Sequence, residues 1–497
     1  MTDNKLAGET PPTSPNAPAH GHAELSGRMG VAPLMLTVLA FSAPIAAVAG
    51  FIPFTIILGG EGATLVFVFA TVLMLLFAVG YVTMTKSIPR PGSFYAFISA
   101  GLGKVVGLGG AFLALAAYLL ILSGCYVFTG LFVTEFINSQ GGPTTPWWVW
   151  AALSWALVSV LCYFHIEVSA KILTVAMALE VAIVMIFNLA VLARGGGPNG
   201  YSADPITPST LSQGDVSLAL LFAIMIFLGF EATALFRDEV RDPDRTIPRA
   251  TYGAVLFVGT LYILSCYLLT TAYGDGAVQA ATDSPKSMFA DAIGQFAAPM
   301  FSDLTFVFII TSELAAAISV HNVTSRYTYN LGRDQALPAA LAKVHPRHAS
   351  PYRASVVVAA VVALVLVPLG LGNTTGIGLD AQLFGLGTVG VLVLMTLVSL
   401  SVIVWFGREP ALAGAHWFKC FGAPGLAVVA LGATVVFAVL NFELVVGGPP
   451  GQNLGLLVVL AAFLVGGSLL AVYFRQFKPE IFARLGRAEG SEVESVS

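Results

Sequence analysis

The stretch FLGFEATALFRDEVRDPDRTIPRA (227–250) carries the most informative pattern in the chain. It begins as an apolar run that Gly229 interrupts, and the carboxylate of Glu231 follows two positions later. Beyond this point the segment becomes densely charged, with acidic residues interleaved among its arginines. The four arginines are Arg237, Arg241, Arg245 and Arg249. An apolar run that holds one carboxylate and ends in arginines predicts a membrane helix with a functional group inside it.

The composition of the whole chain supports this interpretation. Of its 497 residues, 57% are hydrophobic and only 10% are charged, and the mean hydropathy is +0.85. Soluble domains carry roughly 25% charged residues. Apolar stretches of about 20 residues, long enough to cross a ~30 Å hydrocarbon core as helices, recur along the chain. Continuous apolar runs favour helices over alternating strands, so the sequence predicts an all-α polytopic membrane protein.

About twelve spans are expected. They cover residues 31–58, 62–85, 105–137, 147–164, 169–193, 215–236, 251–273, 301–325, 354–371, 382–406, 421–443 and 453–474. The segment 92–103 is expected to form a short amphipathic helix that leads into the third span. The transmembrane domain is thus predicted to occupy residues 31–475, between a disordered tail (1–30) and a second tail (476–497) that ends in an acidic, Ser-containing stretch.

Lys and Arg residues predict the orientation, because they accumulate on the cytoplasmic side of membrane proteins. With both termini cytoplasmic, 21 of the 23 basic residues fall on that side, and only Arg194 and Lys286 do not. The net charge of −4 gives no indication of a nucleic-acid partner, because the basic residues are spread over one membrane face. The four cysteines, Cys125, Cys162, Cys266 and Cys420, are expected to be buried small residues without disulfides.

Three carboxylates are predicted at membrane depth: Glu180 in the fifth span, Glu231 in the sixth and Glu313 in the eighth. A charged side chain there costs at least ~2.5–3.5 kcal/mol, and no Lys or Arg lies comparably deep. Each glutamate must therefore be protonated, hydrogen-bonded or paired with an arriving ligand. All three are candidates for proton coupling. The alternative for each is a neutral carboxyl group that is hydrogen-bonded to a neighbouring helix.

Two spans contain helix-breaking residues. The first holds FSAPIAAVAGFIPF (41–54), with Pro44 near its middle and Pro53 later, and the sixth holds Gly229. Proline removes a backbone donor and glycine weakens a helix. Paired broken helices at corresponding positions of two repeats are typical of transporters. A simple kink, with neighbouring helices covering the freed groups, is the alternative.

Motifs for other chemistries are absent from the sequence. The glycines of GLGKVVGLGGAF (101–112) are not followed by GK[ST], so they predict helix packing and not a phosphate loop. No nucleophile elbow, metal-ligand cluster or nucleotide motif is present. We therefore expect neither an enzyme nor a bound cofactor or metal.

Three stretches together resemble the amino acid–polyamine–organocation superfamily of secondary transporters over roughly residues 30–475. They are LGFEATALFRDEVRDPDRTIPRA (228–250), SVHNVTSRYTYNLGRDQALPAALAKVHPRHASP (319–351) and IPRPGSFYAFISAGLG (88–103). The resemblance implies a five-plus-five inverted repeat, about 31–193 and 215–406, with two extra helices at about 421–474. It also implies alternating access around a central site.

In that family the substrate lies between the unwound parts of spans one and six. The corresponding residues here are Ser42, Ala43, Pro44, Ile45, Ala46, Ala47, Met225, Phe227, Leu228, Gly229, Phe230 and Glu231. Two departures matter. Ala46-Ala47-Val48 replaces a G-x-G in span one, and Glu180 stands where proton-coupled members often carry a lysine. We therefore expect Glu180, and no lysine, to be the protonatable group.

The sequence thus predicts a multi-pass cytoplasmic (inner) membrane transporter that imports an amino acid or related small amine, with H⁺ as the coupling ion and the lipid bilayer as its surroundings. A putrescine-like polyamine importer, an exchanger and a non-transporting sensor remain alternatives. A Na⁺ site at Thr311 and Ser312 is another, although both are ordinary interhelical hydrogen-bonding residues. Substrate identity, direction of flux and oligomeric state stay open.

Overall fold

The chain folds as an all-α protein. The computed structural model describes residues 29–88, 94–164, 170–345, 350–372, 378–409, 416–442 and 452–486, and no β-strand is formed in these ranges. Within them, ten helical stretches are long and apolar enough to cross a membrane, and the shorter apolar helix at Trp147–Tyr163 accompanies them. The predicted fold class is confirmed. The exact number of crossings remains a prediction.

Every predicted span contains a helix. The first five hold α1 (Val31–Ser42), α2 (Pro44–Ala46), the π-helical turn η1 (Ala47–Phe51), α3 (Ile52–Gly59), α4 (Ala63–Ser87), α6 (Lys104–Ser139), α7 (Trp147–Tyr163) and α8 (Ala170–Ala193). The next five hold α9 (Val216–Met225), the 3₁₀ segment η5 (Phe230–Glu239), α10 (Pro243–Tyr273), α13 (Met300–Arg333), α14 (Tyr352–Leu371) and α15 (Leu379–Arg408). The last two hold η8 (Phe418–Gly422) with α17 (Ala423–Leu440), and α19 (Gln452–Phe477).

Short elements connect these helices. They are η2 (Gly60–Gly62), α5 (Phe94–Leu102), η3 (Asp204–Ile206), η4 (Pro208–Gln213), η6 (Gly274–Gly276), α11 (Ala277–Asp283), α12 (Met288–Phe296), η7 (Ala339–Ala342) and α20 (Pro479–Arg484). Helix α5 is the short helix that was predicted at 92–103, and it ends at Leu102, just before α6 begins.

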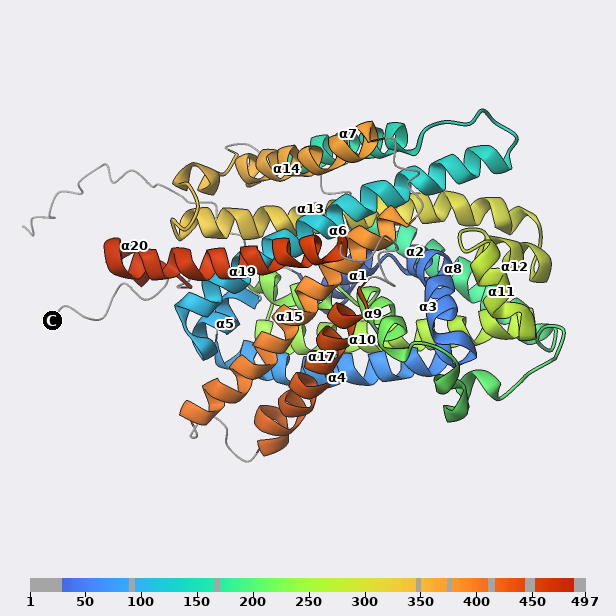
Figure 1. Cartoon of the computed structure of the whole chain (residues 1–497), viewed down its shortest axis with the longest axis horizontal. Helices are drawn as coiled ribbons and strands as arrows, with labels where there is room; N and C mark the ends of the chain where they lie inside the picture. Colours follow the sequence, from blue (N-terminus) through green and yellow to red (C-terminus); the bar gives the residue numbers. More distant parts are fainter. Residues whose placement is uncertain are drawn as a thin grey trace, which may run out of the picture.

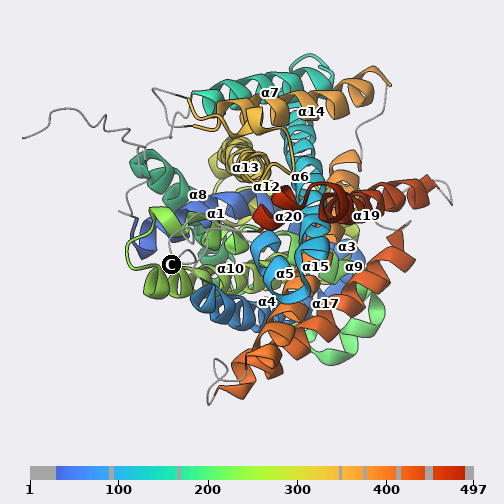
Figure 2. The same cartoon turned by 90° about the vertical axis from the view of Figure 1, so that its left-hand side faces the viewer.

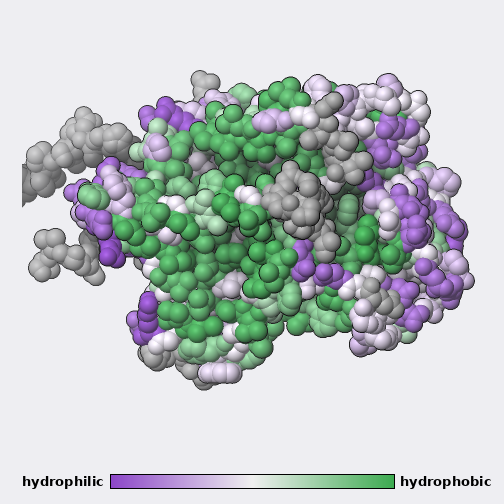
Figure 3. Space-filling model, in the orientation of Figure 1, coloured by the Kyte–Doolittle hydropathy of each residue, from purple (hydrophilic) through white to green (hydrophobic). Residues whose placement is uncertain are grey.

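The long helices run side by side. In Figures 1 and 2, α7 and α14 lie together on one flank, α4 and α10 lie on the opposite flank, and α6 and α13 pass between them. The outer surface shows a broad apolar band, with hydrophilic residues gathered towards the two ends of the long axis (Figure 3). Leu364, Leu371 and Leu440 are among the large apolar side chains that point outwards. Such a band suits contact with lipid, where exposed apolar side chains carry no penalty.

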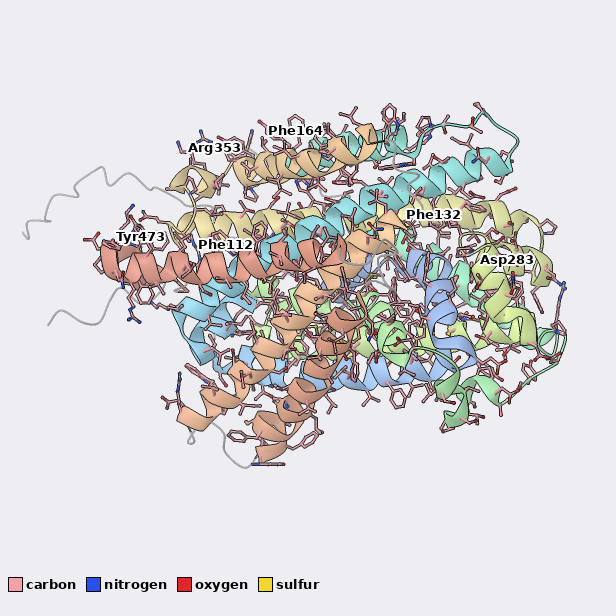
Figure 4. The ribbon with its side chains drawn as sticks, in the orientation of Figure 1. Phe112, Phe132, Phe164, Asp283, Arg353 and Tyr473 are labelled. Atoms are coloured by element: carbon pink, nitrogen blue, oxygen red, sulfur yellow. The ribbon has the colours of Figure 1, made fainter. Side chains whose placement is uncertain are left out.

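The two ends of the molecule differ in what they carry. Arg353 and Tyr473 lie at the end that also holds α20, which we call the arginine-rich end (Figure 4). Asp283 lies at the opposite end, beside α11 and α12, which we call the α11–α12 end. Around the junction of η5 and α10, Arg237 pairs with Asp244 at 2.9 Å and Arg245 pairs with Asp242 at 3.7 Å. All four cysteines are buried and free, as predicted.

The segment after α19 is docked onto the helix bundle. Lys104 Nζ donates hydrogen bonds to the carbonyls of Phe482 at 3.0 Å and Ala483 at 2.7 Å. Leu485 is 0% exposed, and the Gly486 N–H donates to Tyr95 Oη at 2.7 Å and to Asp334 Oδ2 at 3.1 Å. The sequence predicted only a tail here, and residues 487–497 lie outside the described ranges, as do residues 1–28 of the other predicted tail.

Leu485→Ala is expected to release this docked segment. Removing a buried leucine side chain costs about 2–5 kcal/mol, and at a chain end that loss appears as local opening. We expect amide hydrogen exchange at residues 479–486 to accelerate at least ~10-fold, since each 1.4 kcal/mol changes an equilibrium tenfold. Glu480→Ala, on the exposed side of α20, is the matched control and should leave exchange unchanged. Equal exchange in both variants would contradict the docking.

Candidate functional site

The first span is interrupted near Pro44. Helix α1 ends at Ser42, and Ala43 adopts a left-handed conformation with φ 43° and ψ 69°. The helix restarts at Pro44, whose missing N–H costs nothing at a helix start. Because a non-glycine residue in this conformation costs on the order of 1–2 kcal/mol, the surrounding packing must hold the break in place. A π-helical turn, Ala47–Phe51, follows it.

The sixth span is interrupted near Gly229. Helix α9 ends at Met225, and the chain continues after Gly229 as the 3₁₀ segment η5. Gly229 has φ 117°, and a Cβ atom there would lie 2.7 Å from Cβ of Phe41. Glycine is thus required both by the backbone conformation and by the close approach of α1. Both predicted interruptions are confirmed, although the 3₁₀ continuation was not predicted.

A buried hydrogen-bond network joins the two breaks. Ser42 Oγ donates to the Ile226 carbonyl at 2.7 Å, so it accepts from the Tyr262 hydroxyl, which lies 2.9 Å away. The end of α1 is thereby held against the end of α9, and Tyr262 of α10 is held against both. The main chains of the two interruptions therefore lie close together in the protein interior.

The carboxylate of Glu231 contacts the interruption in its own span. It is 0% exposed; its Oε2 accepts from the Gly229 N–H at 2.7 Å, and its Oε1 accepts from the Tyr118 hydroxyl at 3.0 Å. The Tyr81 hydroxyl donates to the Glu231 carbonyl. Both carboxylate oxygens have donors, so Glu231 links the sixth span to α6. Sequence reasoning missed Tyr81 and Tyr118, because a single tyrosine in an apolar span carries no pattern.

Glu180 of α8 faces the restart of the first span. Its Oε2 accepts from Ser312 Oγ at 2.6 Å, and the Ile45 main chain is a further hydrogen-bond partner. Helix starts carry unpaired N–H groups and a positive partial charge, so a carboxylate is well placed there. Glu180 thus connects three elements, namely α8, α13 and α2.

The proposed Na⁺ ligands are not brought together. The Ser312 hydroxyl is engaged by Glu180, whereas Thr311 is exposed and donates to the Phe308 carbonyl of its own helix. In the described ranges, no group of three or more His, Cys, Asp or Glu side chains is arranged to hold a metal ion.

A small cavity of about 40 Å³ lies beside the two breaks. It is lined by Phe41, Ser42, Ala43, Ala47, Phe51, Ile121, Cys125, Met225, Ile226, Leu228, Glu313, Ala316, Val320 and Phe384. Five of the predicted substrate residues are among these: Ser42, Ala43, Ala47, Met225 and Leu228. The other seven are not: Pro44, Ile45, Ala46, Phe227, Gly229, Phe230 and Glu231. The Phe227 ring packs on Tyr262 and the Phe230 ring packs on Phe77 instead.

The rest of the lining comes from α6, α13 and α15. It consists of Ile121, Cys125, Ala316, Val320 and Phe384, with Glu313 as the one charged side chain among the described residues that line the cavity. Sequence reasoning placed Glu313 among the proton-coupling candidates and treated Cys125 only as a buried small residue. No pattern in the sequence indicated that α15 contributes Phe384.

Aromatic side chains cover the cavity on two sides. Along α6 from its start at Lys104, Tyr118 comes first, then Ile121 and Cys125, and then Phe128 and Phe132. Tyr118 contacts the rings of Phe41 and Tyr327, with centroids 6.2 and 5.7 Å away. We call these three rings the Tyr118 cluster.

The second aromatic group lies further along α6. Phe51 stacks on Phe128 at 5.2 Å and meets Phe384 edge-on at 5.2 Å, and Phe132, labelled in Figure 4, stacks on Phe128 at 4.3 Å. We call these four rings the Phe51 cluster. Because Ile121 and Cys125 lie between Tyr118 and Phe128 on one helix, the cavity lies between the two clusters.

Comparison with known proteins identifies this architecture. The family model described as amino acid permease matches residues 35–482. The chain belongs to the amino acid permease family. This permease is therefore a multi-pass membrane transporter, and the resemblance stated from its sequence motifs is confirmed.

Individual relatives share about a quarter of their residues with this permease. It is 26% identical over 388 residues to the branched-chain amino acid permease BcaP of Bacillus subtilis (strain 168), covering 74% of this chain and 79% of that protein. It is 24% identical over 400 residues to a methylthioribose transporter of the same organism, with 77% and 82% covered. It is 23% identical over 397 residues to the low-affinity putrescine importer PlaP of Escherichia coli (strain K12), with 78% and 83% covered. The names of these relatives indicate three different substrates.

Proposed function

We propose that this permease imports an amino acid or a related small amine across the cytoplasmic membrane, together with a proton, by alternating access. The observation that carries this proposal is the cavity beside two interrupted spans. Both termini are assigned to the cytoplasm, because that assignment places 21 of the 23 Lys and Arg residues on one side. The arginine-rich end is then the inner end of the molecule.

The surroundings of the cavity support a small polar substrate. The main-chain carbonyls around the two breaks would accept from the ammonium group of an amino acid, whereas the N–H groups of Leu228 and Gly229, which here donate to Met225 and Glu231, would bind its carboxylate only by exchanging those partners. Ligand pockets usually measure about 300–1,000 Å³, whereas this cavity measures about 40 Å³, so the surrounding helices must move apart for a substrate to bind. The Tyr118 and Phe51 clusters act as inner and outer gates, which open in turn.

Glu180 supports proton coupling through its position. Its carboxylate bonds to Ser312 on α13 and to the restart of the first span at Ile45. Protonation removes the negative charge that favours this contact with a helix start. Protonation of Glu180 therefore weakens its contact with Ile45, and deprotonation strengthens this contact. When the contact is weak, the interrupted first span can move and expose the cavity to one side of the membrane.

Uptake into proteoliposomes tests the function. A panel of labelled amino acids and polyamines is offered with and without an inward proton gradient. Accumulation of one substrate above equilibrium, only with the gradient, would establish proton-coupled import. Counterflow without gradient-driven accumulation would instead establish an exchanger, and binding without any flux would establish a sensor on the same fold.

Glu180→Gln is expected to uncouple transport from the proton gradient. Glutamine still accepts hydrogen bonds from Ser312 and Ile45 but carries no exchangeable charge, so the site keeps its shape. We expect gradient-driven accumulation to fall at least ~10-fold, the usual scale for removing a proton-transfer group, while counterflow persists. Glu135→Gln, further along α6 than the Phe51 cluster, is the control. Intact gradient-driven accumulation in Glu180→Gln would exclude Glu180 as the coupling group.

A further inference from the structure

The three deep glutamates occupy different settings, and Glu313 differs from the other two. Glu231 has a donor on each carboxylate oxygen, and Glu180 is held by Ser312 and Ile45. Glu313 is 2% exposed and lines the cavity. The thiol of Cys125, which lines the same cavity, is the polar side chain beside it. A thiol is a weak donor, so most of the bonding capacity of this carboxylate faces the cavity.

The charge that lines the cavity is negative. Among the described residues, no Lys, Arg or His side chain lines it, and the carboxylates of Asp380 and Glu180 both act electrostatically on Glu313. Asp380, at the start of α15, is 2% exposed, and Lys286, which does not line the cavity, acts on Asp380 with the opposite charge. Cavities lined by one sign of charge between apolar walls concentrate ligands of the opposite sign. This cavity therefore favours a cation.

The rest of the wall around Glu313 is apolar. Ile121, Ala316 and Phe384 offer no group that could pair with a carboxylate. A purely apolar substrate side chain placed here would leave Glu313 unpaired and cut off from water, which costs free energy. An ammonium group would pair with it at about 2.7–2.9 Å, the usual length of a charge-assisted hydrogen bond.

We propose that Glu313, with Cys125 beside it, is the cation-binding part of the cavity, and that this permease selects substrates with an ammonium group on the side chain or at a second end. Short basic amino acids and α,ω-diamines have this shape, whereas branched-chain amino acids do not. The proposal rests on the proposed function, because it takes the cavity to be the place where the transported molecule binds.

Cys125 provides a test that does not depend on transport. It is the cysteine that lines the cavity, whereas Cys162, Cys266 and Cys420 do not. A variant in which those three are replaced by serine leaves Cys125 as the single thiol. A methanethiosulfonate reagent reacts with it when the thiolate attacks the sulfenyl sulfur, forms a mixed disulfide and releases methanesulfinate. Mass spectrometry of the intact protein in proteoliposomes follows the rate.

The experiment compares an ethylammonium, an ethylsulfonate and a neutral methyl reagent, each normalised to its rate with a free thiol in solution. We expect the ammonium reagent to be favoured over the neutral one at least ~10-fold, corresponding to one charge-assisted contact. Glu313→Gln should remove this preference, and Glu313→Asp should retain most of it. Because the ratio of two reagents is used, a change in the ionisation of Cys125 itself cancels.

The possible outcomes separate the two proposals. Equal preference for the ammonium reagent before and after Glu313→Gln would overturn the role of Glu313, whatever the transport data show. Import of a neutral branched-chain amino acid that is unaffected by Glu313→Gln would overturn it as well, while leaving the proposed function intact. A preference that depends on Glu313, together with protection of Cys125 by a diamine, would support it even if no flux were detected and the proposed function failed.

Discussion

Gly229→Ala is expected to abolish transport. The residue has φ 117°, and the added Cβ would lie 2.7 Å from both Cβ and Cγ of Phe41. Together the backbone strain and the clash cost about 2–5 kcal/mol. Relieving them requires α1 to move away from the break in the sixth span, which would also disturb the Ser42 hydrogen bond to Ile226. We expect initial uptake to fall at least ~30-fold, since each 1.4 kcal/mol is a factor of ten, and the thermal unfolding midpoint in detergent to drop.

The matched control for this change is Gly466→Ala. Gly466 lies within α19, and a Cβ atom there would meet nothing within 4 Å. Alanine in a helix interior is favoured over glycine by about 0.5–1 kcal/mol, so stability should be unchanged or slightly higher and uptake should be normal. If Gly229→Ala transported at more than half the unsubstituted rate, the break in the sixth span would not need glycine.

Glu231 should respond differently to two substitutions. Glu231→Gln keeps an acceptor for the Gly229 N–H and a partner for the Tyr118 hydroxyl, so it preserves the shape of the break but cannot exchange a proton. We expect uptake to fall at least ~10-fold while the unfolding midpoint stays within a degree or two of the unsubstituted protein.

Glu231→Ala leaves the Gly229 N–H and the Tyr118 hydroxyl without their acceptor in an apolar interior. An unsatisfied buried donor costs about 1–3 kcal/mol, so this variant should lose thermal stability as well as uptake. Uptake and unfolding are measured on the same detergent-purified preparations. Unchanged binding and uptake in Glu231→Gln, with destabilisation in Glu231→Ala, would show that Glu231 is solely a packing residue of the break.

The predictions for Gly229 and Glu231 both depend on how the two interrupted spans are held together. The two interrupted spans are held together by groups that the chain itself supplies, such as Ser42 for Ile226, Glu231 for Gly229 and Glu180 for Ile45. Under the alternating access that we propose, such contacts would break and re-form as the cavity opens to one side and then to the other. Glutamates suit this role because their affinity for a backbone N–H changes with protonation.

The sequence by itself determined the membrane spans, the two interruptions and the presence of three deep carboxylates. It could do so because crossing a bilayer is a property of each local segment, set by the length and hydropathy of about 20 residues. The helix breaks are equally local, since Pro44 removes its own N–H and Gly229 permits a backbone angle that other residues resist. The family motifs could also be found in this way, because each is a short continuous stretch.

Only the tertiary structure decided what each carboxylate faces. In the folded protein, Glu231 accepts a hydrogen bond from Gly229, and Glu180 contacts Ser312 and Ile45. Glu313 lines the cavity together with Cys125. Helices that are apolar all round show no stripe to indicate which side faces inwards. Their rotation is set by packing against partners that lie far away in the sequence, as when Phe384 of α15 meets Phe51. For that physical reason the sequence could name the glutamates, whereas their separate roles depend on how the helices pack.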